Sequence, residues 1–191
     1  MIRRAAALLG WIGALQVAAS PALAATEWVV DAARSRLEFT ATLAGGGFDG
    51  QFTRFRPRIA FDPDELAGSR FEVVIETGSA DTGDPERDAI LAGGDFFAAD
   101  RWPTARFEAE RFTSPRPGEF EALGRLTIRD VTRDVTISFT FAPGHTEGPD
   151  ELAGGTRIRR LDFGVGQGEW RDTQWVGDDV DIRFHLFLQR K

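Results

Sequence analysis

The residue types that most often perform catalysis are sparse in this sequence. It contains no cysteine, which excludes thiolate nucleophiles and thiolate metal ligands. Its two histidines, His145 in a predicted loop and His185 on the polar face of a predicted strand, have no second histidine at a metal-ligand spacing. No nucleophile elbow, zinc-protease helix motif or phosphate-binding glycine loop occurs. We therefore predict no catalytic residue, no metal site and no cofactor, and a protein that is not an enzyme.

The chemistry that the sequence does offer is apolar and aromatic. It has 16 phenylalanines and no tyrosine. A buried phenylalanine needs no polar partner, whereas a buried tyrosine must place its hydroxyl group. Many of the phenylalanines alternate with polar residues, as Phe39 does between Glu38 and Thr40. Such rings share one dry face, and they either form a solid core or line a cavity for an apolar ligand.

The elements that must position these rings are strands. Apolar and polar residues alternate in eight segments with turn residues between them, namely 36–43, 52–61, 70–77, 105–113, 119–129, 134–141, 156–165 and 178–190. Pro57 predicts an edge or a bulge in the second segment, and residues 143–155 predict an exposed loop. Eight strands with one dry face each form a sandwich or a closed barrel, and closure removes exposed edges. An eight-stranded interior is wide enough to be filled by side chains or to hold one ligand.

Residues 84–103 interrupt this alternation. Asp84 suits the N-cap of a helix, Pro85 its first position, and Gly93 or Gly94 its end. A loop with Phe96, Phe97 and Trp102 follows. The segment predicts one short helix and an apolar loop that together form a plug.

The first 24 residues predict an export signal. Arg3 and Arg4 precede the apolar run 5–19, and Ala22-Leu23-Ala24 is a small-x-small cleavage site. The run is shorter than the ~20 residues that span a bilayer, which favours cleavage over a membrane anchor. We therefore expect one mature domain, residues 25–191, in the periplasm. The net charge of −7 argues against a nucleic-acid partner and against electrostatic adhesion to anionic lipid.

Five stretches of the sequence carry a resemblance to a known family. They are "VDAARSRLEF", "GQFTRFRPRIAFDP", "VVIETGSADTGDPERDAILAGGDFFAADRWPTARFEAERF", "GRLTIRDVTRDVTI" and "LDFGVG". With them the sequence resembles the YceI-like, polyisoprenoid-binding proteins from about Trp28 to Leu188. Arg34 and Asp130 depart from the family pattern, which usually has His and Gly there, and a turn accommodates Asp.

The resemblance implies an all-β fold, an extended eight-stranded antiparallel lipocalin-like barrel with the short helix and loop plug at residues 84–103. It also implies a non-catalytic carrier or store that holds an isoprenoid lipid, of the isoprenoid quinone or polyprenyl type, in the barrel lumen. The stretch "GQGEWRDTQWVGDDV" is similar to members associated with b561-type cytochromes. The alternative is a periplasmic interaction or stress-response module with a filled barrel, accessory to a membrane b-type cytochrome and without lipid cargo. Oligomeric state stays open, with a dimer among the options.

The predicted lipid contacts come from the dry strand faces and from the plug. They are Phe39, Phe52, Phe71, Ile75, Ile90, Leu91, Phe96, Phe97, Trp102, Phe107, Leu126, Phe139 and Phe163. Three polar residues, Arg87, Asp88 and Asp95, are expected to tie the plug to the barrel rim. In the simpler alternative the plug closes the barrel end without touching a ligand.

Overall fold

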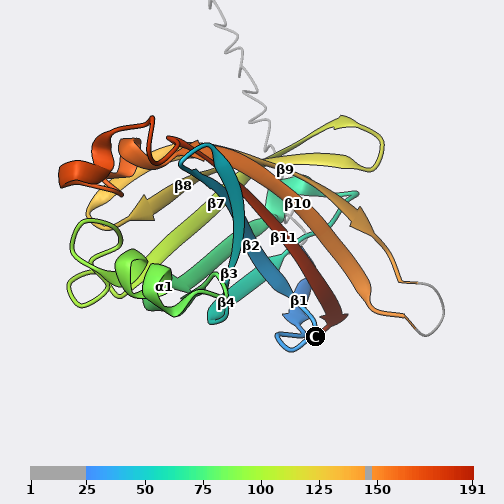
Figure 1. Ribbon diagram of the computed structural model, residues 1–191. Coiled ribbons are helices and arrows are strands. Elements are labelled where there is room, and N and C mark those ends of the chain that lie inside the picture. Colours follow the sequence, from blue (N-terminus) through green and yellow to red (C-terminus); the bar gives the residue numbers. More distant parts are fainter. Residues whose placement is uncertain (1–24, 145–147) are drawn as a thin grey trace, which may run out of the picture.

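The computed structural model describes residues 25–144 and 148–191 (Figure 1). The predicted export signal, residues 1–24, and His145 lie outside these residues. Eleven strand segments form one antiparallel sheet. They are β1 Glu27–Val30, β2 Arg36–Leu43, β3 Gly46–Phe52, β4 Phe55–Ala60, β5 Arg70–Glu76, β6 Ala80–Asp81, β7 Thr104–Arg116, β8 Glu119–Ile128, β9 Val131–Ala142, β10 Asp150–Arg159 and β11 Asp179–Arg190. The helices are α1 Pro85–Ala92 and the short 3₁₀ turns η1 Leu66–Gly68, η2 Thr77–Ser79, η3 Arg160–Phe163 and η4 Gly168–Arg171.

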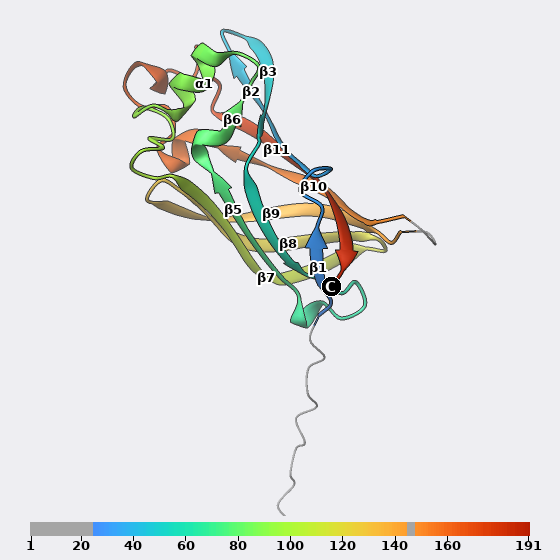
Figure 2. The same ribbon diagram turned by 90° about the horizontal axis from the view of Figure 1, so that it is seen from below.

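The eleven segments amount to eight strands, because three of the strands are interrupted. β1 and β2 both pair with β11, β4 pairs with β1 while β3 pairs with β2, and β5 and β6 continue the pattern beside β4 and β3. The ring closes between β1 and β11, where Trp28 pairs with Arg190 and Val30 with Leu188. The predicted all-β, eight-stranded antiparallel barrel with one short helix is confirmed. Figure 2 shows α1 and the β2–β3 hairpin at one end of the barrel and β1 at the other.

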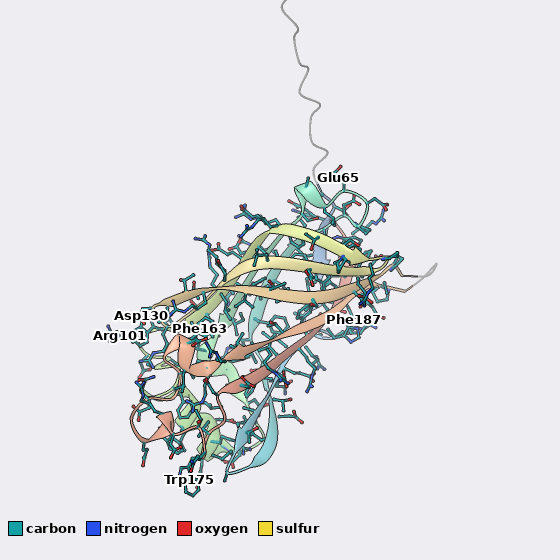
Figure 3. All side chains as sticks on the ribbon, turned by 90° about the horizontal axis from the view of Figure 1, so that it is seen from above. Glu65, Arg101, Asp130, Phe163, Trp175 and Phe187 are labelled. Atoms are coloured by element: carbon teal, nitrogen blue, oxygen red, sulfur yellow. The ribbon has the colours of Figure 1, made fainter. Side chains whose placement is uncertain are left out.

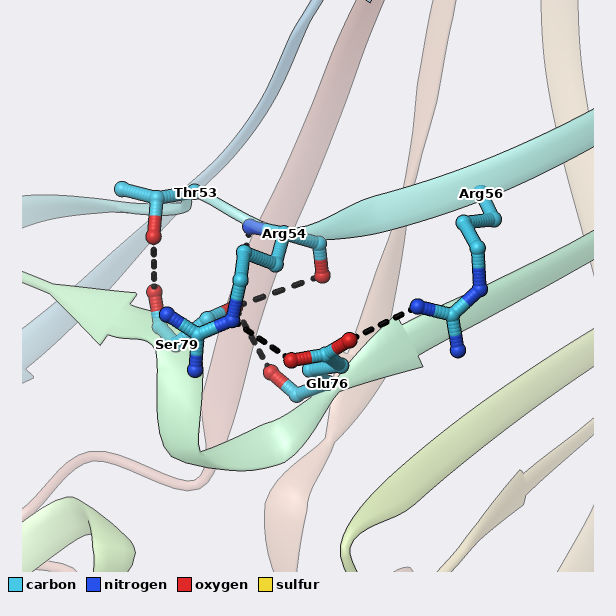
Figure 4. Close-up of polar contacts among 5 residues, drawn as sticks. All are labelled: Thr53, Arg54, Arg56, Glu76 and Ser79. Atoms are coloured by element: carbon cyan, nitrogen blue, oxygen red, sulfur yellow. Dashed lines mark hydrogen bonds and ion pairs between the residues drawn. The ribbon is translucent and has the colours of Figure 1, made fainter.

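Two of the interruptions lie side by side and are joined by hydrogen bonds (Figure 4). The Ser79 hydroxyl accepts a bond from the Arg54 N–H at 3.1 Å and donates to the Glu76 carbonyl at 2.7 Å, and the Thr53 hydroxyl donates to the Ser79 carbonyl at 3.1 Å. These bonds replace the strand ladder where the backbone bends. Outside the bend, hydrogen bonds from Arg54 and Arg56 lower the pKa of the Glu76 carboxyl.

Glycine-containing stretches account for the differences between the predicted and observed strands. The turn of the β2–β3 hairpin falls at Ala44 and Gly45, both at positive φ, and the strand β3 already begins at Gly46. The predicted loop 143–155 is wrong from Asp150 onward, where β10 begins. Its glycines allow neighbouring strands to approach, because a Cβ at Gly154 would overlap the Ser138 carbonyl.

Of two further strand predictions, the end of strand 156–165 is wrong and the edge position of Pro57 is confirmed. The predicted strand 156–165 is wrong after Arg159, where the chain turns into η3. Pro57 lies opposite Val73 of β5, while β1 pairs with β4 only through Ile59 and Ala60. Pro57 therefore has a paired strand on one side only, as predicted for an edge position.

The interruption at residues 84–103 is a helix followed by a loop, as predicted. The Asp84 side chain accepts hydrogen bonds from two N–H groups of the first turn, Pro85 is the first residue of α1, and the Gly93 N–H closes the other end. The loop folds back on the helix, since the Phe97 N–H donates to the Leu91 carbonyl at 3.0 Å. Among the described residues, no helix has the length and apolarity needed to cross a membrane.

Aromatic rings fill the end of the barrel near β1. Phe61 is fully buried, and five phenylalanine rings have centroids 5.1–6.2 Å from its own, those of Phe71, Phe112, Phe120, Phe139 and Phe141. Trp28 joins them, and its indole N–H donates to the Phe61 carbonyl at 2.9 Å, which satisfies its polar atom. We call these seven residues the aromatic cluster. They give one end of the barrel a solid core.

Replacing Phe61 by alanine should destabilise the whole barrel. A buried Phe→Ala change costs about 3–5 kcal/mol, because it removes apolar contacts and leaves a cavity. Chemical denaturation of the two proteins measures this difference. The control is Val29→Ala on the outer face of β1, where Val29 is 50% exposed and the expected change is within ~0.5 kcal/mol. Equal stability of Phe61→Ala and the wild type would contradict the assignment of the core to this cluster.

Candidate functional site

The barrel is hollow beyond the aromatic cluster. A cavity of about 170 Å³ lies between the strands, and its walls are apolar. All eight strands contribute to these walls. Apolar cavities of roughly 150 Å³ stay dry and accept apolar guests such as benzene. The two sequence-based alternatives, a solid aromatic core and a cavity, are therefore both present, at different heights of one barrel.

The hollow part lies toward the end of the barrel that carries α1. Along the inner face of β11, Val180, Ile182 and Phe184 are half-buried, whereas Leu186 and Leu188 are buried. The inner faces of β4, β9 and β10 show the same trend between the two ends. A guest in the cavity would therefore extend from the aromatic cluster toward α1.

Two aromatic rings of the cavity wall, those of Phe39 and Phe107, pack against glycines of neighbouring strands. Phe39 of β2 pairs with Gly50 of β3, and a Cβ at Gly50 would overlap the Phe39 ring. A Cβ at Gly124 of β8 would likewise come within 2.6 Å of the Phe107 ring. A ring that covers a glycine occupies the space of the missing side chain. Both rings thus take up less of the lumen than they would beside a larger residue.

Seven of the predicted lipid-contacting residues line the cavity. They are Phe39, Phe52, Phe71, Ile75, Phe97, Phe107 and Leu126. Six of them come from the dry faces of strands, where the alternation of side chains places them inward. Phe97 comes from the plug loop and its ring centroid lies 5.8 Å from that of Phe52. Their contact with a lipid stays a prediction.

Two predicted strand residues are buried but do not line the cavity. Phe139 belongs to the aromatic cluster at the solid end. Phe163 lies in η3, where the chain has already left the barrel wall, and it is buried beneath that turn. Neither residue is among those that line the cavity. Alternation predicts the face of a side chain but not its height along the barrel axis.

Most of the plug side chains also stay outside the cavity. Ile90 is 43% exposed on α1, so its predicted inward position is wrong. Leu91 and Phe96 are buried in the core beneath the plug, and the Phe96 ring lies 5.6 Å from that of Trp170. The plug therefore packs largely against segment 160–177, which forms the other half of this end of the barrel.

Trp102, also predicted to face the lumen, instead contacts two guanidinium groups. Those of Arg101 and Arg129 lie 4.3 and 4.6 Å from the centre of a Trp102 ring. Arg129 also donates hydrogen bonds to the carbonyls of Phe96 and Gly164, at 3.1 and 2.5 Å. Sequence reasoning did not identify Arg129, which joins the plug to segment 160–177.

The three predicted rim residues bond within the plug or across it. Asp88 accepts hydrogen bonds from the N–H and the hydroxyl of Thr82, at 2.9 and 2.6 Å. Arg87 donates to the same hydroxyl at 2.9 Å, and its guanidinium lies 4.6 Å from the Phe48 ring centre on β3. Asp95 acts through its main-chain carbonyl, which accepts two N–H bonds from segment 160–177 at 2.8 Å each. Arg87 and Asp95 thus connect the plug to its surroundings.

Sequence reasoning missed Arg160, a residue of the cavity wall that is only 5% exposed. Its guanidinium makes no ion pair with a described carboxylate. It donates instead to main-chain carbonyls at 2.7–3.3 Å, those of Val165, Gly166, Trp170, Val176 and Gly177. Burial lowers the pKa of Arg160, and the nearby Asp178 charge opposes this. Arg160 therefore organises segment 160–177 from inside.

The signal for this arrangement was present in the stretch "LDFGVG". Gly166 has a φ of 82°, and a Cβ there would overlap the Arg160 guanidinium. A glycine at this position therefore serves both the left-handed turn and the space that the buried arginine needs.

The polar side chains at the cavity wall are already engaged. The Thr77 hydroxyl donates to the Trp102 carbonyl at 2.8 Å and the Thr156 hydroxyl to the Thr136 carbonyl at 2.9 Å. In residues 25–144 and 148–191, no group of three His, Asp or Glu side chains could hold a metal ion. The site therefore offers apolar contact surface to a guest.

Comparison with known proteins assigns the family. The family model of the YceI-like domain matches residues 28–188. The chain belongs to the YceI-like family. A UPF0312 protein of Vibrio vulnificus is 30% identical to it over 181 residues, which cover 91% of this chain and 92% of the relative. The resemblance predicted from the sequence motifs is thereby confirmed.

Solved structures share the fold of this YceI-like chain. The crystal structure of BcnA from Burkholderia cenocepacia is 31% identical with a TM-score of 0.80, over 84% of this chain and 99% of that one. A polyisoprenoid-binding domain from Saccharophagus degradans, implicated in plant cell wall breakdown, has a TM-score of 0.68 at 14% identity, over 87% of this chain and 99% of that one. The latter likeness shows the fold alone.

Replacing Arg160 by lysine should destabilise segment 160–177. An ammonium group has three donors, so it cannot satisfy the carbonyls that the guanidinium serves, and the free energy of unfolding should fall by about 3 kcal/mol or more. Denaturation and hydrogen exchange of residues 165–177 measure the effect. Arg159→Lys is the matched control, because Arg159 is exposed and pairs with Asp162 at the surface. Equal loss in both variants would contradict the role assigned to Arg160.

Proposed function

We propose that this YceI-like chain is a non-catalytic protein that holds the tail of an isoprenoid lipid, either an isoprenoid quinone or a polyprenyl lipid, in its barrel. The observation that carries the proposal is the apolar cavity of about 170 Å³ beyond the aromatic cluster. A prenyl tail needs no hydrogen-bond partner, and the cavity wall offers none. Membership of the YceI-like family and the likeness to a polyisoprenoid-binding domain support the same class of ligand.

The energetics favour a carrier or store that releases its lipid. Burial of a tail of ~40 carbons at ~0.8 kcal/mol each is nominally worth ~30 kcal/mol, above the ~18–21 kcal/mol at which non-covalent affinities saturate. The competing environment is the bilayer, which is as apolar as the barrel. The preference for protein over membrane is therefore small, and exchange in both directions is feasible.

The barrel is too short to enclose a long tail in extended form. A strand of ~8 residues rises ~27 Å, and a tilt near 40° reduces this to ~20 Å along the axis. A tail of eight isoprene units extends roughly 40 Å by covalent geometry. The aromatic cluster occupies part of the barrel length as well. The cavity of about 170 Å³ holds only part of such a tail, so the rest would protrude at the α1 end.

We also propose a periplasmic location, which rests on the charged and apolar pattern of residues 1–24 and the small-residue site Ala22-Leu23-Ala24. The alternative, an accessory of a membrane b-type cytochrome without cargo, rests on the stretch "GQGEWRDTQWVGDDV" alone. That alternative assumed a filled barrel. The cavity supports a bound lipid instead.

Protein isolated from its native host should carry a prenyl lipid. Organic-solvent extraction followed by mass spectrometry measures the lipid and identifies its head group and tail length. An unrelated exported protein purified in parallel controls for membrane lipid carried through the preparation. Extracts of native protein without any prenyl species would contradict the proposal.

A carboxylate in the cavity wall should abolish lipid loading. Leu126→Asp places an unpaired charge among apolar side chains, and lipid content should fall at least about tenfold. Phe97→Asp, in the plug loop, tests the same wall at a half-buried position. Ile90→Asp is the matched control, since Ile90 is exposed on α1 and outside the cavity. If either wall variant folds, as judged by circular dichroism, and loads like the wild type, the cavity is not the binding site.

A further inference from the structure

We propose that the α1 end of the barrel docks on a lipid bilayer through a docking tip formed by Trp175 and by residues 43–47 of the β2–β3 hairpin. Trp175 is 62% exposed and Leu43 is 38% exposed. Figure 3 shows Trp175 projecting at one extremity of the molecule, far from Glu65 at the other. Trp175 is thus largely exposed to water at this extremity.

The two parts of the docking tip are bonded to each other. The Ala44 N–H donates to the Trp175 carbonyl at 2.7 Å, and Leu43 forms an isolated β-bridge with Val176. The Gly177 N–H donates to the Thr42 carbonyl at 2.9 Å. The segments that carry Leu43 and Trp175 are therefore bonded side by side at this end of the barrel, although they are far apart in sequence.

Exposed apolar side chains gather at this end of the barrel. Among the described residues, the large hydrophobic side chains that are exposed are Val29, Leu43, Ile90 and Trp175. Leu43 is the last residue of β2, beside the β2–β3 turn, and Ile90 lies on α1, so both belong to the α1 end, as Trp175 does, whereas Val29 lies on β1 at the other end. Three of the four exposed large hydrophobic residues are therefore found at the hollow end of the barrel.

The charge pattern of the docking tip fits the interfacial region of a bilayer. Residues 40–48 and 173–177 contain no charged residue, in a chain of which 28% is charged. Tryptophan is enriched where acyl chains meet headgroups. Arg171, four positions before Trp175, donates a hydrogen bond to the Gln167 side chain at 3.2 Å and makes no ion pair with a described carboxylate, so a lipid phosphate would be its charged partner at the membrane. Because the net charge is −7, docking relies on insertion of the tip rather than on general attraction to anionic lipid.

The docking tip is joined directly to the cavity wall. Arg160, a wall residue, donates to the carbonyls of Val176 and Gly177 at 2.7 and 2.9 Å. Contact of Trp175 with the bilayer would thus bring the hollow end of the barrel to the membrane surface. As far as it concerns cargo exchange, this inference rests on the proposed function, since it lets a prenyl tail pass between bilayer and barrel without crossing water.

Vesicle flotation tests the docking tip. The wild type, the double variant Leu43→Ser/Trp175→Ser and the control Val29→Ser are mixed with vesicles of phosphatidylethanolamine and phosphatidylglycerol. The N-terminal residue of each preparation is determined first, so that residues 1–24 are alike in all three. The partition coefficient of the double variant should fall about tenfold or more, because two apolar side chains lose their burial. Val29→Ser should bind like the wild type.

Three outcomes overturn the proposal: a wild type that does not float, a double variant that floats equally well, and a control that loses binding to the same extent. Dimerisation that depends on Trp175, with no flotation, would assign the tip to a second copy of the chain and overturn it too. Prenyl lipid content is measured in the same preparations. Lipid without flotation contradicts docking alone, whereas flotation without prenyl lipid contradicts the proposed function alone.

Discussion

Closure of the sheet forces the inner side chains of eight strands into one shared interior. Because β1 pairs with both β4 and β11 and so closes the ring, an inward residue can meet only other inward residues or empty space. At one end, Phe61 and its neighbours are bulky enough to meet across the axis. Farther along, side chains such as Val135 and Ile182 are too short to do so, and two rings rest over glycines. The position of the aromatic cluster thus sets both the stability of the barrel and the location of the cavity.

The two ends of the barrel are held by different kinds of interaction. The β1 end is held by apolar contacts among rings. The α1 end is held mostly by hydrogen bonds to main-chain carbonyls, with Arg129 and Arg160 as donors and Asp95 as an acceptor. That is also the end at which the cavity lies.

Arg160 shows how a cation can be stable beside an apolar cavity. The guanidinium has five donors in a planar fork, and the surrounding carbonyls of segment 160–177 satisfy them. The guanidinium of Arg160 thus points into segment 160–177, and none of its N–H donors is free to bind a guest in the cavity. The YceI-like fold itself does not specify a ligand, because one fold can serve several functions. The apolar wall of this chain is the feature that narrows the choice to an apolar guest.

Local pattern in the sequence was sufficient for the strands, the face of each strand and the helix. The alternation around Phe39 and Leu126 pointed both side chains inward, and Asp84, Pro85 and Gly93 marked the ends of α1. These features depend on neighbours within a few residues, so they can be read before the chain folds. The family motifs added the barrel, and the class of ligand that they imply is part of the proposed function.

Only the tertiary structure determined the position of each inward residue along the barrel axis and the way in which the loops pack. Phe139 and Phe39 have the same local pattern, yet one belongs to the solid end and the other to the cavity, because strand register places them. In the sequence, Arg160 has the pattern of an ordinary basic residue in a strand. In the structure it begins η3, and main-chain carbonyls surround its guanidinium. Its partners lie 5 to 17 residues away in the chain, and folding alone brings them together.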